Sequence, residues 1–235
     1  MNRAQVPMIV RIRQRWESIS PKLTYVGLWA SLALLMVAFP FFQGPHVSSA
    51  FTVLLALLLG AAALTIRGGR LLKIVALLFL TASVGAQATF SLNGEEWLVL
   101  LSYLFAAMTL AWVTVLLFLS LFRTKEVTST TLWEAVSVYI LIGLTWASVY
   151  TMLELISPGS FEDSTLPGAA MSFHTFVYYS FVTLATLGYG DIVPMTQEAR
   201  GLAIIEVLTG VLYMAILISR LVGTWKPRRN GENER

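Results

Sequence analysis

The sequence contains no cysteine, and only 12% of its 235 residues are charged. Without a thiol, the chain can form no disulfide framework, no thiolate metal site and no cysteine nucleophile. Its Lys and Arg residues occur in short runs between apolar stretches rather than on a folded basic face, so nucleic acid is not an expected partner. Hydrophobic residues, in contrast, make up 57% of the chain, and the mean hydropathy is +0.73. This balance is typical of a membrane protein.

Apolar runs long enough to cross a membrane recur six times. A spanning helix needs about 20 mainly apolar residues, and such runs lie near 24–42, 47–66, 71–90, 97–122, 132–156 and 200–222. Between the fifth and sixth runs, a segment at 172–185 would rise only about 21 Å as a helix, which is too short to cross. The glycine- and proline-containing stretch after it predicts a return to the side of entry. We therefore expect a re-entrant hairpin.

The basic residues of the predicted loops lie on alternate sides of the membrane. All but one of the 16 Lys and Arg residues fall on one side, and only Arg200 lies opposite. By the positive-inside rule, the basic side is cytoplasmic. We therefore expect a multi-pass protein of the plasma (cell inner) membrane, in contact with membrane lipids and with both termini in the cytoplasm. The hairpin enters from the outside, where acidic loops would attract cations.

These features divide the chain into five parts. Residues 1–23 form a basic cytoplasmic or interfacial segment, 24–122 a four-helix module, 123–130 a cytoplasmic linker, 131–223 a two-span unit with the hairpin, and 224–235 a short cytoplasmic tail. The sequence shows no nucleophile–base pair, no metal-ligand cluster and no phosphate loop. We therefore expect neither an enzyme nor a cofactor.

The hairpin leads into a turn-rich segment, Thr186-Leu187-Gly188-Tyr189-Gly190-Asp191. Non-helical backbone at membrane depth is tolerated only where protein buries it or where it lines a water-filled path. Gly188 and Gly190 can adopt left-handed conformations without a Cβ penalty, which would let successive carbonyls face a common axis. Rings of such oxygens can replace the hydration shell of a monovalent cation. One motif per chain requires four chains, so the predicted partners are three identical subunits.

This segment resembles the signature of the potassium-channel superfamily, and residues 181–185 and 192–194 resemble its bacterial members. The resemblance covers about residues 131–223. It implies an all-α membrane protein with six transmembrane helices plus a re-entrant pore helix and selectivity filter, assembled as a four-fold tetramer. It also implies that the Thr186 hydroxyl helps form the innermost site, and that K+, the permeant ion, binds along a filter made of Thr186, Leu187, Gly188, Tyr189 and Gly190.

The same resemblance indicates which residues support the filter. It implies that Tyr189 points away from the axis and packs against pore-helix aromatics, for which Tyr178 and Tyr179 occupy the matching positions. Where some relatives carry a pore-helix glutamate that pairs with the filter aspartate, this chain has Val182. Asp191 therefore needs another partner, and Tyr178 is a candidate.

The last apolar run contains further candidates. Gly210 lies 24 residues after the first filter threonine, a spacing that resembles the inner-helix hinge of the superfamily, but helix packing would explain it equally well. Glu206, one turn earlier, is an ionisable residue in a spanning helix. We favour a contact behind the filter, with a pore-helix hydroxyl or a neighbouring subunit, over a place on the ion path. The face that would line the inner pore continues at four-residue intervals through Met214, Ile218 and Val222.

The fourth apolar run, from Trp97 to Phe122, contains no Lys or Arg. Voltage-gated channels share the layout of six spans with a pore after the fifth, but a sensor needs several charges that move through the membrane field. We therefore predict passive, potassium-selective conduction that is not gated by a classical voltage sensor. The alternatives are a weakly selective cation channel, a secondary transporter and a non-conducting regulatory subunit.

Overall fold

The computed structural model describes residues 70–93, 95–123, 129–165, 168 and 171–224. The first two predicted spans, the N-terminal segment, the tail beyond Thr224 and most of the predicted linker lie outside the described residues. Within them, four helices are long and apolar enough to cross a membrane, at Leu71–Phe90, Trp97–Phe122, Thr131–Ile156 and Gln197–Gly223. These spans agree within a few residues with the last four of the six predicted runs.

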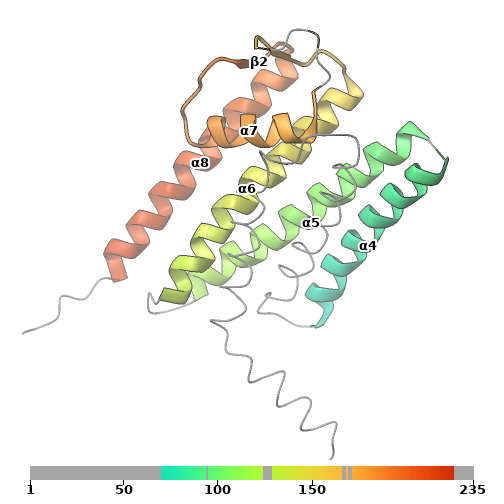
Figure 1. Cartoon of the computed structure of the whole chain (residues 1–235). Helices are drawn as coiled ribbons and strands as arrows, with labels where there is room; N and C mark the ends of the chain where they lie inside the picture. Colours follow the sequence, from blue (N-terminus) through green and yellow to red (C-terminus); the bar gives the residue numbers. More distant parts are fainter. Residues whose placement is uncertain (1–69, 94, 124–128, 166–167, 169–170, 225–235) are drawn as a thin grey trace, which may run out of the picture.

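The helices that carry these spans are α4 (Arg70–Asn93), α5 (Glu96–Arg123), α6 (Ser129–Ile156) and α8 (Gln197–Thr224). α4 packs against α5, α5 against α6, and α8 lies beside α6 (Figure 1). The short helix α7 (Phe173–Leu184) lies across one end of this bundle and packs against both α6 and α8. With 12 residues it rises only about 18 Å and does not span. A mainly helical fold with four candidate membrane spans is thus present in the described residues.

The buried core lies mainly between α5 and α6. Leu110, Leu117, Leu141 and Leu144 are fully buried there. Several Ser and Thr hydroxyls of these helices donate to the carbonyl four residues earlier in their own helix, which satisfies them without a partner from outside; examples are Thr109, Thr114, Thr145 and Ser148. Between the two helices, the Ser120 hydroxyl donates to the buried carboxylate of Glu134.

Two strands of three residues each depart from the predicted all-α fold. β1 (Phe161–Asp163) pairs antiparallel with β2 (Ile192–Pro194), so that Phe161 lies opposite Pro194 and Asp163 opposite Ile192. Strands of this length show no alternating pattern in the sequence, because alternation needs at least four residues to be recognised. The pairing joins the loop after α6 to the chain just beyond the predicted filter.

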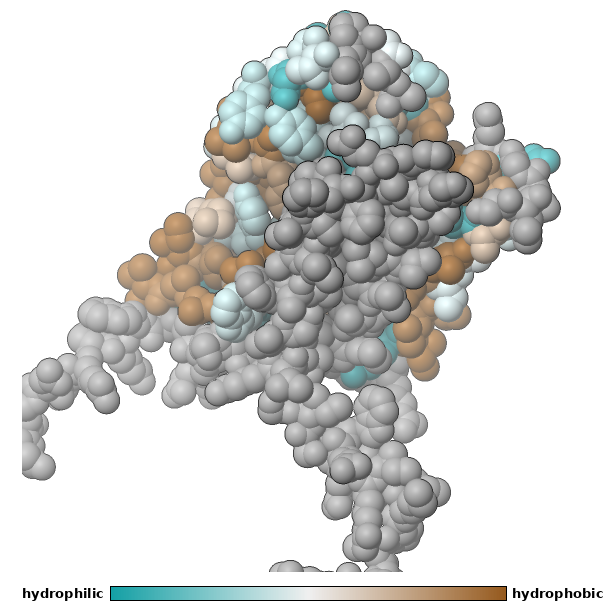
Figure 2. Space-filling model, viewed as in Figure 1, coloured by the Kyte–Doolittle hydropathy of each residue, from teal (hydrophilic) through white to brown (hydrophobic). Residues whose placement is uncertain are grey.

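The visible surface is hydrophobic along the helices and more hydrophilic at the end that carries α7 and β2 (Figure 2). α8 exposes a row of large apolar side chains, which in a membrane face lipid or other helices rather than water. This row includes Ile204, Ile205, Leu208, Val211 and Leu212.

Candidate functional site

α7 places the predicted filter directly after its last turn. Its N-cap, Ser172, accepts a hydrogen bond from a backbone N–H of the first turn at 3.3 Å, which satisfies one donor that the helix leaves open. At the other end, the Thr186 N–H donates to the Thr183 carbonyl and the Leu187 N–H donates to the Val182 carbonyl, both at 2.9 Å. These bonds close the helix, and the chain leaves it at Thr186.

The backbone alternates in handedness through this segment. φ is 59° at Thr186, 56° at Gly188 and 77° at Gly190, whereas the two residues between them have negative φ. Thr186 is the one non-glycine residue with positive φ in the described part of the chain, a conformation that residues with a Cβ seldom adopt. Alternating right- and left-handed residues turn successive peptide groups the same way. The segment is therefore neither helix nor strand, but a row of similarly directed backbone groups.

The filter segment is exposed in the single chain. Leu187 is 57% exposed and Tyr189 is 67% exposed. The expected packing of Tyr189 on pore-helix aromatics therefore stays a prediction.

Asp191, at the end of this segment farther along the chain from α7, is held through both its side chain and its backbone. The Tyr178 hydroxyl donates to its Oδ2 at 2.5 Å, and the Ile192 N–H donates to its Oδ1 at 3.0 Å. Ser164 donates its N–H at 2.8 Å and its hydroxyl at 2.9 Å to the Asp191 carbonyl. The hydrogen bond to the carboxylate raises the pKa of Tyr178 to about 12. The candidate partner from the sequence is thus present, and Ser164 is an additional one.

Tyr179 points to the other side of α7, into a buried cluster of aromatic rings. Its ring centroid lies 5.1 Å from that of Tyr150 in α6 and 5.3 Å from that of Phe161 in β1. Phe176 lies 5.0 Å from Phe161 and completes the cluster. These rings meet edge to face, an arrangement that adds about 0.5–1.5 kcal/mol per pair beyond area burial. Tyr179 therefore anchors α7 to α6 and β1.

Glu206 of α8 is fully buried behind α7. Its Oε2 accepts a hydrogen bond from the Tyr150 hydroxyl of α6 at 2.5 Å, and its Oε1 lies 2.5 Å from the Ser180 hydroxyl of α7. The Ser180 oxygen also lies 2.8 Å from the Gly143 carbonyl oxygen of α6. The contact with a pore-helix hydroxyl was predicted from the sequence. The contributions of Tyr150 and Gly143 were not, because α6 lies far away in the chain.

Gly210 lies against the last turn of α7. A Cβ at this position would lie 2.5 Å from the Leu184 carbonyl oxygen and 3.0 Å from Leu184 Cδ1. α8 runs without a break from Gln197 to Thr224. Close packing at Gly210 is therefore observed, and a hinge there stays a prediction. Beyond Gly210, the side chains predicted to line the inner pore are exposed in the single chain: Met214 by 44%, Ile218 by 54% and Val222 by 69%.

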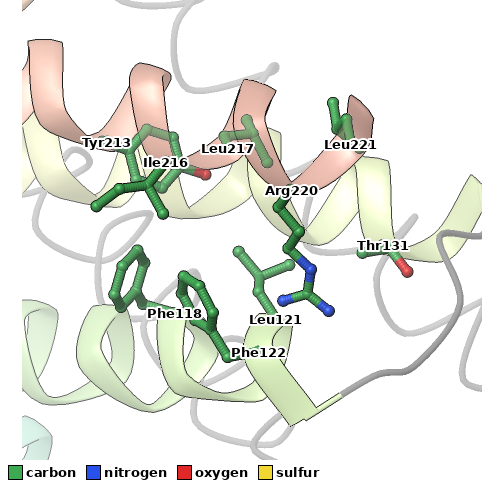
Figure 3. A pocket seen from close by; sticks show the side chains of 9 residues that line it. All are labelled: Phe118, Leu121, Phe122, Thr131, Tyr213, Ile216, Leu217, Arg220 and Leu221. Atoms are coloured by element: carbon green, nitrogen blue, oxygen red, sulfur yellow. The ribbon is translucent and has the colours of Figure 1, made fainter. Parts of the chain in front are cut away.

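At the other end of α8, a cavity between α5 and α8 is too small for a ligand. Its volume is about 10 Å³, room for one water at most. The Arg220 guanidinium lies over the Phe122 ring, 5.2 Å from its centroid (Figure 3). Nearby, the Tyr213 ring lies 6.1 Å from that of Phe118. This region is therefore a packed contact between α5 and α8. Within the described ranges, no group of three or more His, Cys, Asp or Glu residues could hold a metal ion.

Comparisons with known proteins identify a family for the region from α6 to α8. A family model described as Ion channel matches residues 138–225, which include most of α6, all of α7 and α8, and the segment between them. Protein LctB of Bacillus caldotenax is 30% identical over 128 residues, which cover 52% of this chain and 93% of that protein. No solved structure matches the chain.

Two plant proteins are also similar. Two-pore potassium channel 4 of Arabidopsis thaliana is 31% identical over 98 residues, which are 42% of this chain and 34% of that channel. Two pore potassium channel c of Oryza sativa subsp. japonica is 37% identical over 84 residues, which are 36% of this chain and 16% of that channel. The chain thus spans about a third or less of each plant channel.

Proposed function

Because this chain belongs to the Ion channel family, we propose that four copies of it form a potassium-selective channel that conducts K+ passively across the plasma membrane. The observation that carries the proposal is the alternation of φ at Thr186, Gly188 and Gly190, directly after a helix too short to span. The names of the two plant relatives support potassium as the ion. The proposed subunit has six spans, one pore loop and cytoplasmic termini.

In the assembled pore, backbone carbonyls along residues 186–189 bind K+ in place of its hydration shell, and the Thr186 hydroxyl completes the innermost site. Four chains are needed because one chain supplies only one side of each ring of oxygens. The exposure of Leu187 and Tyr189 in the single chain supports this assembly, since neighbouring subunits would cover them. The negative end of the α7 dipole points toward the inner end of the filter and favours a cation there.

The remaining site residues hold or extend this pore. Tyr178 and Asp191 support the filter at its outer end, whereas Tyr179 and Glu206 support α7 from behind. Gly210 lets α8 approach the end of α7 closely enough to maintain this arrangement. The inner pore continues along the exposed face of α8 at Met214, Ile218 and Val222.

The reversal potential tests this function. Purified protein in planar bilayers, with a K+ gradient balanced by Na+, should give unitary current steps that reverse near the K+ equilibrium potential. A reversal near zero would instead identify a weakly selective cation channel. Slow, saturating transport without unitary steps would identify a secondary transporter. Assembled protein that carries no current would instead favour a non-conducting regulatory subunit.

Replacing Tyr178 by phenylalanine should weaken the outer end of the filter and reduce K+ current by about two- to tenfold, the cost of leaving a carboxylate oxygen without one of its donors.

The hydrogen bond between Tyr178 and Asp191 also predicts that the K+ current depends on pH. Because the pKa of Tyr178 is raised from 10.0 to about 12, its stabilising contribution is complete below pH 10 and is lost between pH 10 and about 12.

The measurement is K+ current as the external pH is raised through that window, in the parent and in Tyr178→Phe. The parent current should fall, and the variant current, already lower, should stay constant. Asp191→Asn serves as a second variant, because it removes the charged acceptor of the same bond. If the K+ current fell equally at alkaline pH in all three proteins, Tyr178 would not be the group whose titration reduces it.

Opening of the channel should depend only weakly on voltage. α5 carries charged residues only at its ends, Glu96 and Arg123. A sensor gains about 2.3 kcal/mol per elementary charge per 100 mV, and steep opening needs several such charges in each subunit. Open probability can be measured from about −100 to +100 mV in symmetric K+ without divalent cations. A steep sigmoid equivalent to several moved charges per tetramer would contradict this reading of α5.

A further inference from the structure

The carboxyl group of Glu206 is buried in a spanning helix among hydroxyl groups. It is 0% exposed, and within the described part of the chain its polar contacts are the hydroxyls of Tyr150 and Ser180. Among the residues that the structure describes, the titratable side chains that interact with it are tyrosines, Tyr139 and Tyr150 from α6 and Tyr179 from α7. Tyrosines are neutral near pH 7. None of these neighbours supplies the positive charge that a buried carboxylate ordinarily needs.

The number of protons available to this cluster indicates whether Glu206 is ionised. The Ser180 oxygen lies 2.5 Å from Glu206 Oε1 and 2.8 Å from the Gly143 carbonyl oxygen. A serine hydroxyl has one proton to donate, and a carbonyl oxygen can only accept. If Glu206 were ionised, Ser180 would face two acceptors with a single proton. One of the two short oxygen–oxygen contacts would then contain no hydrogen and would be repulsive.

A protonated Glu206 places one proton in every contact. Its Oε1–H donates to the Ser180 oxygen, the Ser180 hydroxyl donates to the Gly143 carbonyl, and the Tyr150 hydroxyl donates to Oε2. The result is a continuous chain of hydrogen bonds from α6 through α8 and α7 back to α6. Complete networks of this kind fix buried groups in one arrangement, whereas incomplete ones are costly.

We propose that Glu206 is a neutral carboxylic acid that donates a hydrogen bond to Ser180 and thereby positions α7 between α6 and α8. Ser180 lies six residues before Thr186, so a shift of α7 would displace the first residue of the filter segment. The helices are close enough here to transmit such a shift, because a Cβ on Gly143 would lie 2.7 Å from the Phe181 ring. The consequence for ion flux rests on the proposed function; the protonation state does not.

Glutamine tests the proposal because it has nearly the same shape as the neutral acid. Its amide N–H can donate to Ser180 and its amide oxygen can accept from Tyr150, so Glu206→Gln should retain K+ flux within about twofold. Glu206→Ala removes the donor and the acceptor together and should reduce flux at least about tenfold. Glu198→Ala provides a matched control, because Glu198 is an exposed glutamate of the same helix. Its flux should equal that of the parent.

Infrared spectroscopy reads the protonation state directly. At neutral pH, the parent protein in lipid bilayers should show a C=O stretching band of a protonated carboxylic acid that is missing from Glu206→Gln. The band should move in Ser180→Ala, which lacks the acceptor of the acid proton. An ionised Glu206 would leave no such band in the difference spectrum.

Two results would overturn the proposal. One is a parent-minus-glutamine spectrum that contains only carboxylate bands. The other is an assembled Glu206→Gln protein whose flux is as low as that of Glu206→Ala. If the alanine variant does not assemble, the glutamine variant and the spectrum still decide. If the parent itself conducts no K+, the proposed function fails, while the infrared comparison still determines whether Glu206 is protonated.

Discussion

Replacing Gly188 by aspartate is expected to reduce K+ current by at least about a hundredfold and to leave membrane insertion intact. Gly188 has φ of 56°, in the left-handed region, and nothing lies within 4 Å of a Cβ built on it in the single chain. The effect therefore does not arise from crowding within one chain. In the proposed tetramer, four carboxylates would lie next to the rings of carbonyl oxygens. They would either bind K+ too tightly to release it or push the carbonyl oxygens out of position.

Gly159→Asp is the matched control for backbone strain. Gly159 has φ of 83°, and nothing lies within 4 Å of its Cβ position, but it belongs to the loop between α6 and β1. Both variants therefore place the same side chain on a left-handed backbone. Insertion and tetramer assembly can be compared by membrane extraction and size-exclusion chromatography, and conduction by single-channel recording. An unchanged K+ selectivity in Gly188→Asp would remove the main inference about the filter.

Replacing Gly210 by alanine should destabilise the assembled channel and reduce its K+ current at least about tenfold, through overpacking that typically costs about 1–3 kcal/mol. The added methyl group would lie 2.5 Å from the Leu184 carbonyl oxygen, a distance that real Cβ contacts do not reach. Leu184 belongs to the last turn of α7, and its backbone oxygen cannot rotate away as a side chain could. Either α8 or the end of α7 must move.

The experiment pairs Gly210→Ala with Gly201→Ala in the same helix. Nothing lies within 4 Å of a Cβ on Gly201, so alanine there should only favour the helix. Thermal unfolding of the detergent-solubilised protein should show a lower Tm for Gly210→Ala and an equal or higher one for Gly201→Ala. Equal Tm and equal current in parent and Gly210→Ala would show that this approach of α8 to α7 does not matter.

Several features of the site were predictable because they depend on local sequence. The proposed filter segment follows from two glycines after a helix too short to cross, and both glycines do have positive φ. The pairing of Asp191 with Tyr178 was a candidate because the position of the usual glutamate holds Val182, and that hydrogen bond is present. The positive φ of Thr186 was not anticipated, since threonine shows no preference for the left-handed region.

Other features depend on contacts between distant segments. Tyr179 is buried in a ring cluster with Tyr150 and Phe161, residues from two other elements, so no local pattern indicates that it faces away from the filter. Ser164 bonds to the Asp191 carbonyl across 27 residues of chain. Neither contact has a periodic signal, because each depends on how β1 and α6 pack against α7.

For the part of the chain that the structure describes, the sequence by itself determined where the spanning helices lie and where the chain cannot stay helical. Hydropathy and length identify spanning helices because the lipid phase acts on every residue of a run, and left-handed turns favour glycine because it lacks a Cβ. Only the tertiary structure decided which side chains meet behind the filter. Glu206 acquires its two hydroxyl partners from residues 26 and 56 positions earlier. Such partners depend on how the helices pack against one another, a relation that the local pattern of any one helix does not contain.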